Sequence, residues 1–234
     1  PMMKIRFFLC LVSMIYGVDL QKEAHADQLD VPSRFIEHIV DPTQHDLAIY
    51  WRDKNKQPYR SFQQLNSALQ AQNKTLLFAM NGGIFQEDLT PLGLYVEDGV
   101  IKYRLNTRQN AFGNFYIQPN GVFYLTDKKQ GHVIPTKEFS FDKSIRYATQ
   151  SGPMLIIDGK INTSLTPGST SIRLRNGVGV LPDGRLLFVI SKGFVNFYDF
   201  ADYFKQRGCQ MALYLDGSVS RAYFADSEQI NRDG

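Results

Sequence analysis

The sequence predicts an α+β fold: a single domain of mostly antiparallel sheet with two main helices packed on it. Glycine-bearing turns recur between short apolar runs, at Asp98-Gly99, Asn120-Gly121, Asp158-Gly159 and Pro182-Asp183-Gly184. Such turns are typical of hairpins and favour antiparallel pairing. Two stretches, 61–69 and 196–208, combine a capping residue with helical spacing of apolar side chains.

The first half of the chain is predicted to lead through residues 27–45 into a strand at 47–51. Ser61 is suited to cap the helix that follows. That helix carries an apolar face of Phe62, Leu65, Ala68 and Leu69. Residues 75–80 then form a buried strand, and 85–91 form a loop.

The second half is predicted to consist of hairpins and one helix. The hairpin arms are 94–96 with 100–103, 115–117 with 122–125, 154–157 with 160–161, and 178–181 with 186–191. Asn196 caps the second helix, and Gly208 ends it. Residues 211–215 form the strand that leads to Asp216.

Residues 1–26 have the pattern of a secretory signal peptide. Lys4 and Arg6 supply positive charge, residues 7–18 are uncharged and mostly apolar, and Ala24-His25-Ala26 is a small-residue cleavage site. We therefore expect a mature domain of residues 27–234 that is periplasmic or secreted. The alternative is a permanent anchor, although this apolar run is shorter than the roughly 20 residues that span a bilayer.

Charge, cysteine and histidine content argue against several classes of function. A formal net charge of +3 gives no sign of nucleic-acid binding, and no later segment has the length to cross a membrane. Once the signal peptide is removed, Cys209 remains alone, which excludes an internal disulfide and is typical of a small core residue. His38, His45 and His132 stand in separate segments, which disfavours a Ser-His-Asp triad or a histidine-rich zinc site.

Three polar turns that contain glycine lie beside apolar runs. They are Asn81-Gly82-Gly83, Ser151-Gly152 and Asp216-Gly217-Ser218. Glycine lets backbone N–H groups approach a ligand closely. Three such turns can converge on one cleft, where sheet proteins often bind ligands.

Asp216 is the leading candidate for chemistry, because a carboxylate at the rim of a buried strand is partly desolvated. The alternative is that Asp216 only turns the chain. Asn81 offers an amide to a sugar hydroxyl, or else forms an Asx-type turn. Ser151 has no base nearby in sequence, which favours a turn residue over a nucleophile.

Arg173 and Arg175 alternate along a predicted strand, which places both guanidinium groups on one face. Two such groups suit a phosphate or a carboxylate. The alternative is a solvated outer face. Glu87 and Asp88 are candidate second carboxylates, with a solvated loop as the alternative.

These elements together resemble the phosphodiester glycosidase family over residues 75–224. The matching segments are Asn81-Gly82-Gly83-Ile84-Phe85 with Pro91-Leu92-Gly93, Ser151-Gly152-Pro153-Met154-Leu155 with Asp158-Gly159, Arg175-Asn176-Gly177-Val178-Gly179, and Leu215-Asp216-Gly217-Ser218. The resemblance implies an exported α+β hydrolase that cleaves a sugar 1-phosphodiester in the bacterial envelope. The chain departs from the family pattern at Asn176-Gly177, where Thr-Ala is common, and at Ser218, where Gly is common.

On this resemblance, Asp216 acts as base or nucleophile, Arg175 holds the phosphate and Asn81 positions the sugar. The expected substrate-binding residues are Gly82, Gly83, Ser151, Gly152, Arg173, Asn176, Gly217 and Ser218. No cofactor or metal is expected; a divalent cation bridging the phosphate and Asp216 would fit the chemistry, but no ligand cluster requires one. One alternative is a non-catalytic module that binds phosphorylated glycan or envelope polysaccharide, and another is a structural partner in an envelope complex.

Overall fold

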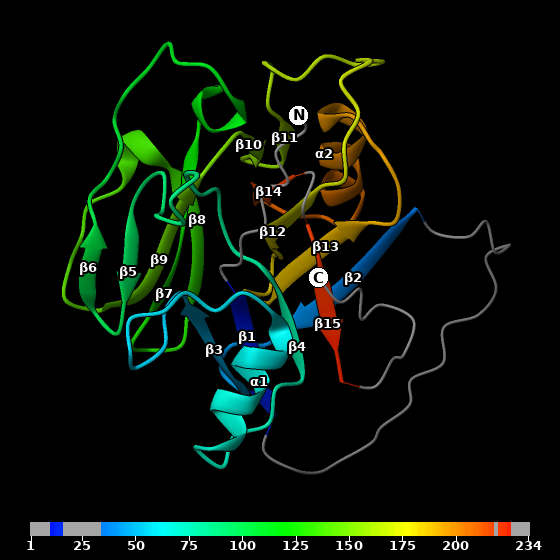
Figure 1. The fold of residues 1–234 in the computed structure, drawn as a ribbon. Coiled ribbons are helices and arrows are strands. Elements are labelled where there is room, and N and C mark those ends of the chain that lie inside the picture. The colour runs from blue at the N-terminus through cyan, green and yellow to red at the C-terminus, as the bar shows by residue number, and fades with distance from the viewer. Residues whose placement is uncertain (1–9, 16–33, 218–219, 226–234) are drawn as a thin grey trace, which may run out of the picture.

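The computed structural model describes residues 10–15, 34–217 and 220–225, which form three antiparallel sheets and two α-helices (Figure 1). The predicted α+β class, the antiparallel pairing and the two main helices are confirmed. The single-domain organisation of residues 27–234 stays a prediction.

The four-stranded sheet carries helix α1 on one face. Its strands, in spatial order, are β15 (Ala222–Phe224), β4 (Phe78–Asn81), β1 (Cys10–Ile15) and β3 (His45–Tyr50), and α1 spans Phe62–Gln70. The apolar side of α1 packs against Ala79 of β4 and Tyr50 of β3. The Ser61 hydroxyl accepts a hydrogen bond from the Gln64 backbone N–H at 3.2 Å, which confirms the predicted cap.

The six-stranded sheet carries helix α2. Its strands, in spatial order, are β11 (Lys160–Ile161), β10 (Met154–Ile157), β14 (Met211–Asp216), β12 (Asn176–Val180), β13 (Leu186–Ser191) and β2 (Phe35–Val40), and α2 spans Phe197–Gln206. The Asn196 side chain caps α2 by accepting a hydrogen bond from the Asp199 N–H at 2.8 Å. Gly208 follows α2 with a φ of 82°, as the predicted C-terminal signal requires.

The five-stranded sheet completes the fold. Its strands, in spatial order, are β6 (Val100–Tyr103), β5 (Tyr95–Glu97), β9 (Ile145–Ser151), β7 (Gly121–Thr126) and β8 (Gly131–Pro135). Phe188 of β13 packs against Phe78 of β4 and Phe123 of β7, with ring centroids 5.5 and 6.2 Å apart. The three sheets therefore bury their inner faces in one shared core.

Alternation along β14 divides its side chains between two environments. Ala212 and Tyr214 pack in the cluster under α2, whereas Leu213 and Leu215 lie in the shared core. The pairing of β14 with β12 shifts register between Tyr214 and Asp216, so this alternation does not extend to Asp216.

One predicted hairpin is wrong. Residues 115–117 are not a strand, because a short 3-10 helix, η1, spans Asn114–Tyr116. Asn120 folds this segment back by donating from Nδ2 to the Phe115 carbonyl at 3.0 Å, and Pro119 has no N–H to pair. Strand β9 was not predicted, because its buried residues Thr149, Gln150 and Ser151 are polar and hide the apolar alternation.

The predicted signal peptide overlaps the described residues only at β1, which lies between β3 and β4. The cleavage site at Ala26 lies outside the described residues, and cleavage stays a prediction. Neither described helix combines the length and apolar character needed to cross a membrane.

Glycines in β12 let α2 lie close to the sheet. A Cβ on Gly179 would lie 2.6 Å from Cys209 Sγ and 2.8 Å from Phe204 Cδ1, both inside van der Waals contact. Cys209 is itself buried, and burial raises the pKa of its thiol to about 12, which confirms a core residue rather than a nucleophile.

We predict that Gly179→Ala lowers the free energy of unfolding by about 1–3 kcal/mol, because the added methyl overfills this contact. Gly193→Ala is the matched control, since its Cβ would meet no atom within 4 Å. Chemical denaturation of both variants checks the prediction. Equal stability of the two variants would contradict close packing of α2 on β12.

Candidate functional site

Asp216 ends β14 and lies beside Asn176, the first residue of β12. The residue is half-buried, and desolvation of its carboxyl raises its pKa to about 7. The Gly217 N–H donates to Oδ1 at 2.7 Å, which partly opposes the rise. Desolvation therefore shifts the pKa of this carboxyl toward neutral pH.

Asn176 joins three strands from two sheets. Its side chain is fully buried, and Nδ2 donates to the Asn81 carbonyl of β4 at 2.8 Å. Its Oδ1 accepts from the Asp216 N–H of β14 at 2.8 Å. One amide thus fixes the end of β14 against the end of β4, so Asn176 supports the site instead of facing solvent.

Asn81 is also buried, at 1% exposure. Its Oδ1 accepts from the Arg221 N–H at 2.8 Å, just before β15. Gly82 and Gly83 follow it and are buried as well. The first predicted turn is therefore held by Asn176 and by the segment that follows the Asp216 turn.

The second turn meets the same strand end. Ser151 is fully buried, and its hydroxyl donates to the Leu215 carbonyl at 2.9 Å. Gly152 packs so closely that a Cβ would lie 2.6 Å from Asn120 Cβ. The structure therefore brings all three turns together at Leu215 and Asp216, with Ser218 outside the described residues.

Tyr214 connects the carboxyl to the arginine. Its buried hydroxyl interacts electrostatically with both Asp216 and Arg175, and Asn114 Nδ2 lies 3.4 Å away. Burial first, and then the Asp216 charge, raise the pKa of Tyr214 well above its usual range. A Cβ at Gly217 would collide with this hydroxyl, so glycine there leaves room for the phenol.

The Arg175 side chain is fully buried and held in one orientation. Its Nε donates to the Val195 carbonyl at 2.8 Å and its Nη2 to the Ser171 carbonyl at 2.9 Å. The guanidinium carbon lies 3.5 Å from the ring centroid of Phe197. The guanidinium also interacts electrostatically with the Tyr214 hydroxyl, and its buried Nη1 has no hydrogen-bond partner among the described residues.

Arg173 and Arg175 were predicted to lie together on one strand, but neither residue belongs to a strand. Arg173 forms only an isolated bridge with Val195, and β12 begins later, at Asn176. The Arg173 side chain is exposed, yet its charge still lowers the pKa of Arg175. The two guanidinium groups therefore lie within electrostatic reach of each other, one buried and one in solvent.

Sequence reasoning missed Tyr214 and Asn114. Alternation alone could not have assigned Tyr214 to the site, because the register of β14 against β12 shifts between Tyr214 and Asp216. No local signal marks Asn114, which approaches from a 3-10 helix 100 residues away in the chain. Glu87 and Asp88 are exposed, and Asp88 accepts from the Thr90 hydroxyl at 2.6 Å, so the solvated-loop alternative holds for them.

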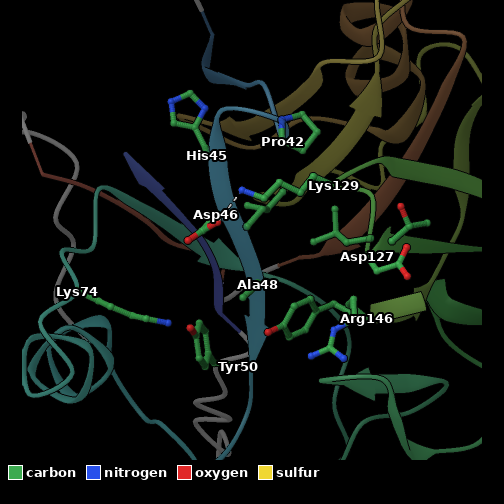
Figure 2. A pocket seen from close by; sticks show the side chains of 13 residues that line it. Pro42, His45, Asp46, Ala48, Tyr50, Lys74, Asp127, Lys129 and Arg146 are labelled. Atoms are coloured by element: carbon green, nitrogen blue, oxygen red, sulfur yellow. Dashed lines mark hydrogen bonds and ion pairs between the residues drawn. The ribbon is translucent and has the colours of Figure 1, made fainter. Parts of the chain in front are cut away.

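The described residues contain no group of three metal-ligating side chains. They do form a cavity of about 410 Å³ between β3 and the β7–β9 face of the five-stranded sheet (Figure 2). Its charged side chains are Lys74, Lys129, Arg146, Asp46 and Asp127. Lys129 pairs with Asp46 at 3.1 Å, and none of the predicted site residues lines this cavity.

Comparisons with known proteins relate the chain to one family and one solved fold. A family described as phosphodiester glycosidase matches residues 74–234. The Escherichia coli K12 protein named "Uncharacterized protein YigE" is 39% identical over 187 residues, which is 80% of this chain and 72% of that protein. The catalytic domain of zebrafish N-acetylglucosamine-1-phosphodiester alpha-N-acetylglucosaminidase, auto-inhibited by pro-peptide, has a similar fold, with a TM-score of 0.52 and 15% identity over 86% of this chain and 77% of that chain.

We predict that Asp216→Asn stabilises the protein at about pH 8 but not at about pH 4. The pKa of Asp216 is about 7 in the folded protein against an ordinary value of 3.8, so the folded state binds the extra proton between these values. The free energy of unfolding therefore falls as the pH rises from about 4 to 7, and the full loss persists above pH 7. Asn carries no charge and keeps an acceptor for the Gly217 N–H.

Thermal denaturation at both pH values measures this effect. We expect a gain in Tm of at least about 2–4 °C at pH 8, the change that about 1 kcal/mol produces in a protein of this size. Asp183→Asn is the control, because Asp183 is exposed and pairs with Arg185 at 2.7 Å, so its replacement gives no gain. The same Tm change for Asp216→Asn at both pH values would refute a raised pKa.

Proposed function

Because the chain belongs to the phosphodiester glycosidase family, we propose that it hydrolyses a sugar 1-phosphodiester and releases the sugar from a phosphate carried by another group. The observation that carries this proposal is the position of the Asp216 carboxyl, whose pKa is raised to about 7 by desolvation where three glycine-bearing turns meet. A carboxyl with such a pKa is suited to proton transfer or attack at neutral pH.

The phosphate of a sugar 1-phosphodiester is already a good leaving group, so the reaction needs little help from a general acid. The site must hold the anion and stabilise an oxocarbenium-like sugar. Asp216 would act at the anomeric carbon, either by activating water or as the nucleophile. Both roles require the ionised form, so activity would rise with pH as Asp216 loses its proton.

Arg175 is proposed to hold the phosphate by the positive charge of its guanidinium, which is fully buried among the described residues. Its hydrogen bonds to Val195 and Ser171 fix the guanidinium before substrate arrives, so little conformational entropy is lost on binding. Arg173, which is exposed, would add a second positive charge from solvent. Tyr214 would act as a positioning residue, because its hydroxyl lies between the charges of Asp216 and Arg175.

The remaining predicted residues would contribute backbone groups and the Asn81 amide. The N–H groups proposed to position sugar hydroxyls and phosphate oxygens belong to Gly82, Gly83 and Gly152, because the Gly217 N–H, also predicted for this role, already donates to Asp216 Oδ1. The proposed setting is the periplasm or the exterior of the cell, after removal of residues 1–26. The signal-peptide pattern supports this part of the proposal.

The experiment is hydrolysis of a methyl phosphodiester of N-acetylglucosamine 1-phosphate by the purified protein, followed by release of the free sugar. The zebrafish structural neighbour, whose printed name refers to N-acetylglucosamine-1-phosphodiester, suggests this first substrate. We predict that Asp216→Asn lowers kcat by roughly 100-fold or more. Arg175→Ala is expected to raise KM and lower kcat.

Asp158→Asn is the matched control, because it changes an Asp-Gly turn that lies in the β10–β11 hairpin and tolerates Asn. It should leave turnover unchanged. For the wild type, kcat/KM is expected to rise to a plateau through about pH 7, following the pKa of Asp216. Unchanged turnover in both Asp216→Asn and Arg175→Ala would refute these assignments.

A non-catalytic glycan-binding role is the second candidate, and the cavity of about 410 Å³ favours it. Its basic residues suit a phosphorylated glycan, and Figure 2 shows Lys74 extending toward Tyr50. Under this alternative, Lys74→Ala with Lys129→Ala would weaken retention of the phosphodiester, and no sugar would be released. Under the hydrolase proposal, the same variant keeps its turnover.

A further inference from the structure

The four-stranded sheet contains a position that the predicted signal peptide occupies. Strand β1 pairs antiparallel with β3 from Cys10↔Tyr50 to Ile15↔His45, and with β4 from Cys10↔Asn81 to Ser13↔Phe78 (Figure 1). Strands β3 and β4 therefore run parallel to each other, about 10 Å apart, twice the usual strand spacing. We call the space between them the strand slot.

Both faces of the strand slot are covered by protein. On one face, Ile49 of β3 and Met80 of β4 lie in the shared core. On the other face, Tyr50 of β3 and Ala79 of β4 pack in the cluster under α1. A strand in this position must therefore tolerate apolar surroundings on both faces. Strands that are buried on both faces are typically continuous apolar runs without charged residues.

The segment Cys10–Ile15 meets this requirement, since it reads Cys-Leu-Val-Ser-Met-Ile. The same property makes it the apolar region of a signal peptide. A short apolar run suits either use, but the two uses exclude each other. Export with cleavage at Ala26 removes the strand that completes the sheet.

An empty slot would be costly. Backbone N–H and C=O groups on the facing edges of β3 and β4 would lose their partners next to buried side chains such as Ile49 and Ala79, both fully buried. Each buried group left unpaired loses a hydrogen bond that neither water nor protein replaces. Direct pairing of β3 with β4 would require one of them to move across the width of a strand.

We propose that the strand slot is a strand-acceptor site. In the full chain the leader segment Cys10–Ile15 fills it, and after cleavage another extended, uncharged apolar peptide segment fills it, antiparallel to both β3 and β4. The second half of this inference rests on the proposed export. The register places the end of the occupant beside Asn81, so a filled slot also supports the strand that Asn176 holds next to Asp216.

Cross-linking tests the first half in the full, unexported chain. In a Cys209→Ala background, Tyr50→Cys places a thiol at the register partner of Cys10. Oxidation is expected to form a disulfide between residues 10 and 50. Asp46→Cys is the control, because residue 46 pairs with Met14, roughly 13 Å along β3, and should not cross-link to Cys10. Equal cross-linking of the two variants, or none in either, would overturn leader occupancy.

Hydrogen exchange tests the second half without cysteine variants. A protease site inserted after Ala26 lets the folded full chain be cut and the leader be removed by dilution. Amides in β3 and β4 are expected to exchange at least about tenfold faster after removal, and a synthetic peptide of residues 10–15 should restore protection. Amides of β13, which does not border the slot, are the internal control.

Unchanged protection in β3 and β4 after the leader is removed would overturn the acceptor role, because it would mean that these strands need no occupant. Faster exchange that the peptide fails to slow would also overturn it. Neither measurement uses a sugar phosphodiester. If the protein does not hydrolyse the phosphodiester, the strand-acceptor proposal is therefore unaffected. If the strand-acceptor proposal fails, the proposed hydrolysis is unaffected.

Discussion

The buried amide of Asn176 is the interaction on which the site depends. It accepts a hydrogen bond from the Asp216 N–H and donates one to the Asn81 carbonyl, which ties the end of β14 to the end of β4. Because its surroundings exclude water, loss of the amide would leave both backbone groups unpaired. Ser151 secures the same strand end from the five-stranded sheet by bonding to Leu215. The carboxyl is thus positioned by all three sheets at once.

This arrangement explains why one Asp-Gly turn differs from the others. Asp98, Asp158 and Asp183 are exposed in hairpin turns, whereas Asp216 is half-buried at the end of β14, and desolvation raises its pKa to about 7. The positive charge that would balance an ionised carboxylate is held behind Tyr214, on Arg175, and does not pair with it directly. The geometry therefore keeps a carboxyl near its titration point and a fixed guanidinium close by, which is the electrostatic pattern that glycosyl-phosphate cleavage requires.

Local signals in the sequence were enough to predict the helices and most hairpins. Ser61 and Asn196 cap helices because capping depends on the neighbouring residues alone. Local signals were not enough to show that the buried Asn176 side chain links two strand ends by hydrogen bonds. Its partners, Asn81 and Asp216, lie 95 and 40 residues away in the sequence. The arginines were predicted to share a strand face, but the burial of Arg175 against Phe197 depends on where α2 packs. Long-range packing, which no periodicity encodes, decides which polar residues support the site and which face a ligand.

The central claim is that enclosure of the Asp216 carboxyl sets it to titrate near neutral pH. Carbon-13 NMR of the aspartate side-chain carboxyls measures this directly, with the Asp216 signal assigned by its absence in the Asp216→Asn variant. The account predicts a titration midpoint near pH 7 for this signal. A midpoint near the ordinary value of about 4 would show a solvated carboxylate and would contradict the account.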